Sequence, residues 1–213
     1  MTGATRPLRV AVLLSGRGTS LENLVEHIDR GLPAEVVCVL SSKKSALGLE
    51  RAAKRGIPAI AVPRKAHPDV SAFNDALHEA LTPFEPDLVC LLGFLSPFEL
   101  RERYVDRVLN VHPALIPAFS GKGFYGRRVH EAVLEKGVKL TGATIHFVGE
   151  GYDEGPILLQ DVVEVRDDDT SDSLAERVQA LERELFPKAV QLIAEGRVTI
   201  DGGRTRIAPA AKD

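Results

Sequence analysis

Residues 8–20 read Leu-Arg-Val-Ala-Val-Leu-Leu-Ser-Gly-Arg-Gly-Thr-Ser, and this sequence is the strongest indication of the fold class. The run from Leu8 to Leu14 is almost continuously apolar, which is typical of a strand covered on both faces. The glycines after it permit a tight turn, and a helix is expected to begin next to them. A strand, a glycine turn and a helix in this order predict the first crossover of a parallel sheet.

The same alternation continues through the first half of the chain. Further apolar runs predict strands at residues 36–40, 59–62, 88–92 and 108–111. Helices are predicted between them at residues 21–30, 46–55, 69–81 and 97–104. Gly31 and Gly56 follow two of these helices, and glycine in this position is a common helix C-terminal signal. The pattern predicts an α/β fold, namely a Rossmann-like, mostly parallel sheet with helices on both faces.

The regular alternation of strands and helices ends after residue 111, where a β-rich C-terminal extension is predicted. It comprises a helix at about 126–136, strands at 140–148 and 157–165, and a long helix at 174–195. Residues 170–172 are expected to cap this helix, and Pro187 to kink or restart it. Asp201-Gly202-Gly203 predicts a hairpin within residues 197–207. We expect a single domain over 1–213, with a phosphate-binding half (1–111), a second half (112–207) and a frayed tail (208–213).

Composition excludes several classes of protein. The net charge is −3 and Trp is absent, so neither a nucleic-acid surface nor an anionic membrane surface is expected. The only cysteines, Cys38 and Cys90, lie in apolar runs without zinc spacing, so they are expected to be buried and reduced. The apolar run 10–14 is too short for a signal peptide or a membrane span, and a cytoplasmic protein is expected.

The loop from Ser15 to Ser20 has the features of a phosphate site. Its glycines allow a ligand to approach the backbone, and the helix that follows offers free N–H groups and the positive end of its dipole. The dinucleotide pattern of three glycines fails because residue 21 is Leu, and no Gly-Lys-Ser or Gly-Lys-Thr occurs. The loop therefore favours a monophosphate, whereas a plain strand-to-helix turn is the alternative.

A second set of polar residues points to acyl transfer. Asn110 and His112 stand two apart at the end of an apolar run, so on a strand they share one face. Alone, Asn-Val-His-Pro is more typical of the end of a strand at which the histidine ring is hydrogen-bonded within the fold and has no catalytic role. Asp153, in a glycine-rich segment downstream, supplies the carboxylate that could charge and orient the imidazole. No Gly-x-Ser-x-Gly elbow occurs, so direct transfer is favoured over an acyl-enzyme. No metal is expected, because His146 is the only other nearby ligand.

With these residues, the chain resembles the phosphoribosylglycinamide formyltransferases (GAR transformylases), which are folate-dependent enzymes of purine biosynthesis. The resemblance runs from Leu8 to about Ile207. It is carried by Leu-Leu-Ser-Gly-Arg-Gly-Thr-Ser-Leu (13–21), Gly-Phe-Leu-Ser-Pro (93–97), Leu-Asn-Val-His-Pro-Ala-Leu-Ile-Pro (109–117), Thr-Gly-Ala-Thr-Ile-His-Phe-Val (141–148), Tyr-Asp-Glu-Gly-Pro-Ile (152–157) and Glu-Arg-Val-Gln (176–179).

The resemblance implies transfer of the formyl group of 10-formyltetrahydrofolate to glycinamide ribonucleotide, without a metal, by a monomer or homodimer. It implies that Asn110, His112 and Asp153 are catalytic. It implies that the ribonucleotide is bound by Gly18, Thr19, Ser20 and Glu182. It implies folate contacts from Phe94, Leu95, Asn110, Gly149, Glu150, Gly151, Tyr152 and Asp153. It implies supporting roles for His146 and for Thr144, the latter beside an active-site water.

Three departures from the family pattern stand out. The phosphate loop ends in Ser20, where the family usually has Asn. The segment after Gly93 is about two residues shorter than the common form and lacks its Arg. The loop from Ser120 to Arg128 is longer than in many members.

Two other functions are also compatible with these residues. One is another folate-linked formyltransferase, acting on initiator methionyl-tRNA, or a formylfolate hydrolase, since both share the Asn, His and Asp pattern. The tRNA enzyme is expected to carry a basic C-terminal barrel, and the hydrolase an extra N-terminal domain. The other is a non-catalytic nucleotide-binding α/β module in which the three polar residues are structural.

Overall fold

The computed structural model describes residues 6–210. These residues form two compact units, the first ending at Val108 and the second beginning at Leu109. The predicted tail of residues 208–213 lies partly outside the described residues, because 211–213 are not among them.

The first unit is built on parallel strands. They are β1 (Leu8–Leu14), β2 (Ala34–Ser41), β3 (Ala59–Ala61) and β4 (Leu88–Leu91). Their order across the sheet is β3-β2-β1-β4, and every pair is parallel. The order reverses direction between β1 and β4, and the carboxyl ends of strands at such a switch point are where open α/β sheets bind ligands.

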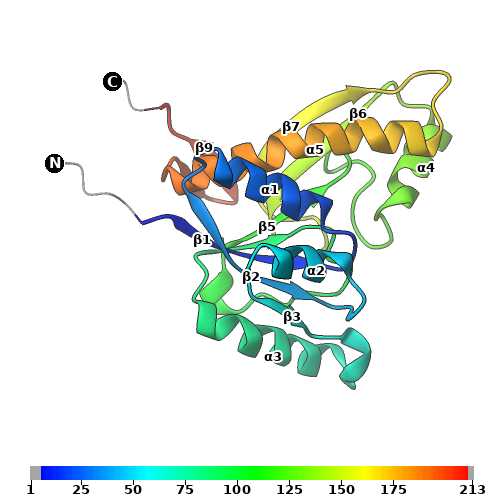
Figure 1. Ribbon diagram of the computed structural model, residues 1–213. Helices are drawn as coiled ribbons and strands as arrows, with labels where there is room; N and C mark the ends of the chain where they lie inside the picture. The colour runs from blue at the N-terminus through cyan, green and yellow to red at the C-terminus, as the bar shows by residue number, and fades with distance from the viewer. Residues whose placement is uncertain (1–5, 211–213) are drawn as a thin grey trace. The chain divides into compact units, whose positions relative to one another are not determined.

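Helices cover both faces of this sheet. They are α1 (Thr19–Asp29), α2 (Leu47–Lys54) and α3 (Val70–Leu81). The chain moves outward from β1 to β3 and then returns to β4. Right-handed crossovers therefore place α1 and α2 on one face and α3 on the other (Figure 1).

Both cysteines lie inside this unit as free, buried thiols, as predicted. Cys38 on β2 and Cys90 on β4 are each 0% exposed. Burial raises the pKa of Cys38 to about 12, and burial raises that of Cys90 as well. Neither sulfur is a thiolate at neutral pH, so both act as small hydrophobic side chains.

The helix predicted over residues 97–104 is wrong. Only a 3₁₀ turn, η3 (Glu102–Tyr104), forms there. The backbone before it is held by side chains of α3 instead. The N–H of Glu99 donates to Asn74 Oδ1 at 2.8 Å, and His78 Nε2 lies 2.9 Å from the carbonyl oxygen of Glu99. These bonds satisfy polar groups that a helix would otherwise have paired internally.

The second unit has an antiparallel sheet and two helices. Its strands β5 (Val108–His112), β6 (Leu140–Phe147) and β7 (Ile157–Glu164) pair in that order. Helices α4 (Arg127–Lys136) and α5 (Ser171–Ala194) pack against each other, and α5 lies along β6 and β7 (Figure 1). The predicted hairpin is confirmed as β8 (Val198–Asp201) and β9 (Arg204–Ile207). Gly202 and Gly203 have the positive φ angles, 55° and 77°, that its two-residue turn requires.

Helix α5 begins as the sequence predicts but passes its proline without a break. Thr170 is the N-cap, and its side chain forms a capping box with Ser173. Pro187 lies inside the continuous helix, so the expected restart is wrong. Pro187 is buried, and tertiary packing offsets the one backbone bond that it cannot make. The Rossmann-like α/β fold with a β-rich C-terminal part is confirmed.

Gly18 and Gly16 give a matched pair for testing the loop after β1. Gly18 has φ +75°, and a Cβ there would lie 2.6 Å from the Cα of Gly48, whereas a Cβ at Gly16 would meet nothing within 4 Å. We predict that Gly18→Ala lowers the free energy of unfolding by about 1–3 kcal/mol. Gly16→Ala should change it by less than about 0.5 kcal/mol. Urea denaturation followed by circular dichroism measures both, and equal losses would contradict the close approach of α1 and α2.

Candidate active site

Strands β5 and β6 bring four polar side chains to one face of the second unit's sheet. Asn110 lies opposite His146 in the antiparallel register, and His112 lies opposite Thr144. Directly opposed residues project to the same side of a sheet. The two imidazoles and the threonine are almost wholly buried, with exposures of 3% for His112, 1% for His146 and 0% for Thr144.

Asp153 reaches this cluster from the loop between β6 and β7. It has the left-handed φ of 59°, which is rare outside glycine and aims its side chain back towards the sheet. The loop is closed by the N–H of Phe147, which donates to Pro156 O at 2.8 Å. Gly155 makes the closure possible, since any Cβ there would collide with the Phe147 carbonyl group.

The Asp153 carboxylate lies between the two imidazoles. Its Oδ2 is 3.5 Å from His112 Nδ1, and its Oδ1 is 3.6 Å from His146 Nε2. Oδ2 also accepts a 2.9 Å hydrogen bond from the N–H of Gly121. The structure thus brings Asp153 to both histidines, and Asn110 joins them through Nδ2, which lies 3.1 Å from His146 Nε2.

Backbone carbonyl groups fix the tautomers of the neutral imidazoles. His112 Nε2 lies 2.8 Å from Phe119 O, and His146 Nδ1 lies 2.9 Å from Phe147 O. A carbonyl oxygen only accepts, so each of these nitrogens carries the proton. The other nitrogen of His112 then presents its lone pair to Asp153, and that of His146 accepts from the amide of Asn110. When His112 Nδ1, which faces Asp153, takes up a proton, the imidazolium and the carboxylate form an ion pair.

The ionisation of this cluster follows from burial and charge. Burial is the largest influence on His112 and lowers its pKa, although the Asp153 charge and the bond to Phe119 O oppose it. Burial acts to raise the pKa of Asp153, but the nearby His146, the Gly121 N–H and the nearby His112 lower it overall. The resting site therefore holds a carboxylate beside neutral imidazole, which is suited to taking up a single proton.

Thr144 anchors the turn that follows β5. Its hydroxyl donates to Ala114 O at 2.7 Å and accepts from Ile116 N–H at 3.1 Å and Gln160 Nε2 at 2.9 Å. These three bonds use its one proton and both lone pairs. No capacity is left for the active-site water expected from the resemblance, so Thr144 supports the site by holding the turn after His112.

The remaining candidate residues of the second unit lie on α5 and the Asp153 loop. Glu182, on α5, is half-buried, and burial raises its pKa to about 7 against the opposing charge of Arg183. A Cβ on Gly149 would lie 3.2 Å from Gly155, so the two ends of the loop touch. Tyr152 is 62% exposed, so its side chain is open to solvent. The other loop positions are Glu150 and Gly151.

In the first unit, the candidate residues form one connected set at the carboxyl edge of the sheet. Helix α1 has no side-chain cap, and its first internal bond runs from the N–H of Glu22 to the carbonyl of Gly18. Within residues 6–108, the N–H groups of Thr19 and Ser20 have no acceptor, as an anion site requires.

A buried serine ties this loop to the segment that carries Phe94 and Leu95. Ser15 Oγ lies 2.8 Å from Ser42 Oγ and accepts from the N–H of Leu95 at 2.9 Å. Phe94 stacks on the buried ring of Phe73, with centroids 6.4 Å apart. The loops after β1, β2 and β4 are therefore held together as one edge.

The described residues contain neither a cluster of metal ligands nor a membrane-spanning helix. Between residues 6 and 210, no group of three or more His, Cys, Asp or Glu side chains is arranged to hold a metal ion. Over the same residues, no helix has both the length and the apolar character needed to cross a membrane.

Comparison with known proteins agrees with this geometry. A formyl transferase family model matches residues 8–190. The chain belongs to the formyl transferase family. The phosphoribosylglycinamide formyltransferase of Arabidopsis thaliana chloroplasts is 41% identical over 197 residues, which are 91% of this chain and 68% of that protein. The glycinamide ribonucleotide transformylase 1 of Symbiobacterium toebii superposes with a TM-score of 0.90 at 39% identity, covering 98% of both chains.

Longer relatives contain the same unit. The trifunctional purine biosynthetic protein adenosine-3 of Bos taurus is 41% identical over 202 residues. Those residues are 92% of this formyl transferase but only 19% of the bovine protein. The resemblance to phosphoribosylglycinamide formyltransferases, and the expectation of a transferase, are confirmed.

Asp153→Asn tests the electrostatic coupling. Removing the negative charge removes an influence that raises the pKa of His112, so that pKa should fall further below its ordinary value. Titration of the imidazole resonances by NMR measures it. Asp172→Asn, on the first turn of α5, is the control and should leave His112 unchanged. A His112 pKa that stays constant or rises in Asp153→Asn would contradict the pairing.

Proposed function

We propose that this chain transfers the formyl group of 10-formyltetrahydrofolate to the amine of glycinamide ribonucleotide. The products are N-formylglycinamide ribonucleotide and tetrahydrofolate, and the step belongs to the biosynthesis of purines (IMP). One observation carries the proposal, namely the ionised Asp153 between two buried imidazoles, with the Asn110 amide beside them. The family membership and the names of the full-length relatives support it.

The reaction is an exchange of one C–N bond for another. The amine of the ribonucleotide attacks the formyl carbon, and negative charge develops on the formyl oxygen. Asn110 has a second N–H beyond the one that faces His146, and it stabilises this oxyanion together with His112. The C–N bond to folate then breaks, and a proton lost by the amine reaches the departing folate nitrogen. His112 carries that proton, and the charge of Asp153 stabilises the imidazolium meanwhile.

The binding roles follow the two units. Gly18, Thr19 and Ser20 hold the phosphate of the ribonucleotide with backbone N–H groups and hydroxyls, and Glu182 accepts hydrogen bonds from the ribose hydroxyls. Phe94, Leu95 and the backbone of residues 149–153 contact the folate. His146 positions Asn110 and shares the Asp153 charge.

The organisation of the protein is also part of the proposal. The two units act as one catalytic domain spanning residues 1–213. The protein works in the cytoplasm as a monomer or homodimer on these small molecules, with folate as co-substrate, with no metal, and with neither nucleic acid nor membrane as a partner.

Two substitutions test the catalytic roles. We predict that His112→Ala and Asp153→Asn each lower kcat by about 10²–10³, because each removes part of the oxyanion and proton-transfer machinery. His27→Ala is the control, since within residues 6–108 its ring bonds only to the carbonyl of Asn23 in its own helix. Folate absorbance follows turnover, and circular dichroism checks that each variant is folded.

The same assay separates the alternatives. Wild-type turnover in both catalytic variants would refute their roles. Folate product formed without the ribonucleotide would identify a hydrolase, and a flat trace with both substrates would favour a non-catalytic binding module.

Glu182 gives a pH test of ribonucleotide binding. Burial raises its pKa to about 7, so the carboxyl group is protonated below that pH and ionised above it. The ionised form accepts hydrogen bonds from both hydroxyls of a ribose. The KM for the ribonucleotide should therefore fall as pH rises from about 6 to about 8. In Glu182→Gln, the part of this fall in KM that depends on Glu182 should be lost. In Glu184→Gln, which changes an exposed neighbour, KM should fall with pH as it does in wild type. Parallel profiles for Glu182→Gln and wild type would exclude the role.

A further inference from the structure

The segment after β4 carries Phe94 and Leu95, which the proposed function assigns to the folate. Residues 94–101 form neither a helix nor a strand, so the regular hydrogen bonds of secondary structure do not fix them. Phe94 stacks on the buried ring of Phe73 in α3, whereas the Leu95 side chain is 61% exposed and free to meet a ligand. The position of this segment therefore depends on bonds to neighbouring elements.

Ser15 anchors the start of the segment. The N–H of Ser15 donates to Gly93 O at 3.1 Å, and Ser15 Oγ accepts from the N–H of Leu95 at 2.9 Å. Ser15 directly follows Leu14, the last residue of β1, so these bonds tie the segment to the sheet. They fix residues 93–95 and leave the rest of the segment to be held elsewhere.

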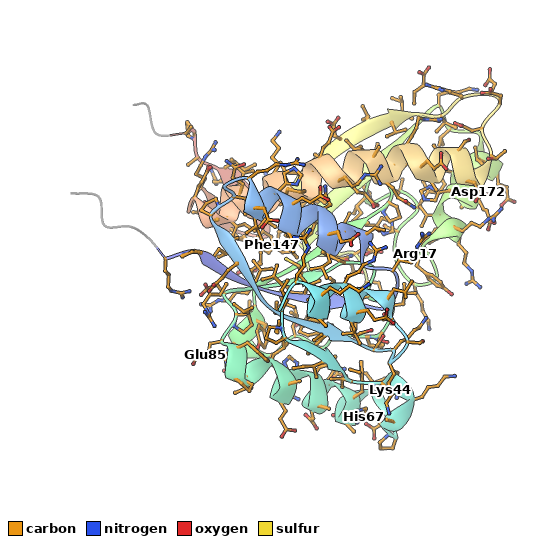
Figure 2. All side chains as sticks on the ribbon, viewed as in Figure 1. Arg17, Lys44, His67, Glu85, Phe147 and Asp172 are labelled. Atoms are coloured by element: carbon orange, nitrogen blue, oxygen red, sulfur yellow. The ribbon has the colours of Figure 1, made fainter. Side chains whose placement is uncertain are left out.

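Helix α3 anchors the end of the segment. Figure 2 shows His67 and Glu85 beyond the two ends of this helix. On α3, Asn74 Oδ1 accepts the N–H of Glu99 at 2.8 Å, and His78 Nε2 lies 2.9 Å from Glu99 O. Both side chains are buried, with exposures of 0% for Asn74 and 6% for His78. A single helix therefore holds the N–H and the carbonyl group of the same residue.

The His78 ring leaves one of its nitrogens unpaired. Burial lowers the pKa of His78, so the ring is neutral at pH 7. A carbonyl oxygen only accepts, so Nε2 carries the proton and Nδ1 keeps a lone pair. Nδ1 is buried and has no partner within residues 6–108. The ring packs against Phe98 and Tyr104, with centroids 5.2 and 5.3 Å away. A phenyl ring would pack there without an unpaired nitrogen, so what histidine adds is the bond to Glu99.

We propose that Asn74 and His78 are positioning residues for the binding of folate. By holding Glu99, they keep Phe94 and Leu95 in the arrangement that contacts the ligand, so that binding does not have to order the segment. The inference rests on the proposed function, because the folate contacts of these two residues belong to it.

The central test is His78→Phe, which keeps an aromatic ring against Phe98 and Tyr104 and removes the bond to Glu99. The KM for 10-formyltetrahydrofolate should rise about 3- to 10-fold, because a segment that is correctly placed for less of the time binds in proportion more weakly. Steady-state assays should show kcat and the KM for glycinamide ribonucleotide within about twofold of wild type. The Tm should stay within about 3 °C, because removal of the unpaired Nδ1 offsets the lost hydrogen bond.

Three further variants make the test specific. Asn74→Leu removes the other bond to Glu99 and should also raise the KM for folate. His78→Gln keeps an N–H donor in place of Nε2 and should bring that KM back to within about twofold of wild type. His27→Phe makes the same substitution on α1, where the ring bonds to Asn23 O, and as the control it should leave every constant unchanged.

Four results would overturn the inference. An unchanged folate KM in His78→Phe contradicts it and leaves the proposed function standing. A lower Tm in His78→Phe, with kcat and both KM values affected alike, assigns His78 a purely structural role. A folate KM that rises as much in His78→Gln as in His78→Phe excludes the bond to Glu99 as the cause. A wild-type protein without turnover contradicts both this inference and the proposed function.

Discussion

The second unit depends on one buried negative charge. Asp153 is 13% exposed at its side chain, and each of its oxygens faces an imidazole. A carboxylate in such surroundings is stable only when it is paired and hydrogen-bonded. The Gly121 N–H supplies a hydrogen bond, and His112 and His146 lower the pKa of the carboxyl group, so these contacts determine where the loops from β5 and β6 must lie. A left-handed residue at 153 and a glycine at 155 allow the chain to reach that position.

Part of this site follows from sequence because the spacing is local. Asn110 and His112 are two apart on a strand, so they share a face in any register. The pairing of Asn110 with His146 depends on how β5 aligns with β6, and a shift of one residue would separate them. The contacts from Phe119 O and Gly121 N–H are made by backbone groups, which carry no side-chain signal in the sequence. The bond from Gln160 Nε2 to the Thr144 hydroxyl joins two side chains, and it depends on how β7 aligns with β6, which the sequence does not give.

The fold shows the same division between local and tertiary information. Apolar runs and glycines located every strand to within two residues, because burial on both faces leaves a strong pattern. The error at residues 97–104 arose where side chains of α3 satisfy the backbone, and propensity cannot register such bonds. The continuous helix at Pro187 is similar, since packing around a buried proline outweighs one lost hydrogen bond.

The two units meet opposite electrostatic demands, and this agrees with the proposed reaction. At the carboxyl edge of the first unit's sheet, the N–H groups of Thr19 and Ser20 have no acceptor within residues 6–108, and Arg17 is exposed, which suits a ligand that stays ionised throughout. In the second unit, His112, His146 and Asp153 are buried together, and burial lowers the pKa of His112, so its imidazole is neutral until a partner charge appears. A histidine that were cationic at rest would already be neutralised by Asp153 and would gain less from an oxyanion. Because burial lowers the pKa of His112, the attraction between imidazolium and oxyanion is realised as the charge develops, and it therefore lowers the barrier more than it strengthens ground-state binding.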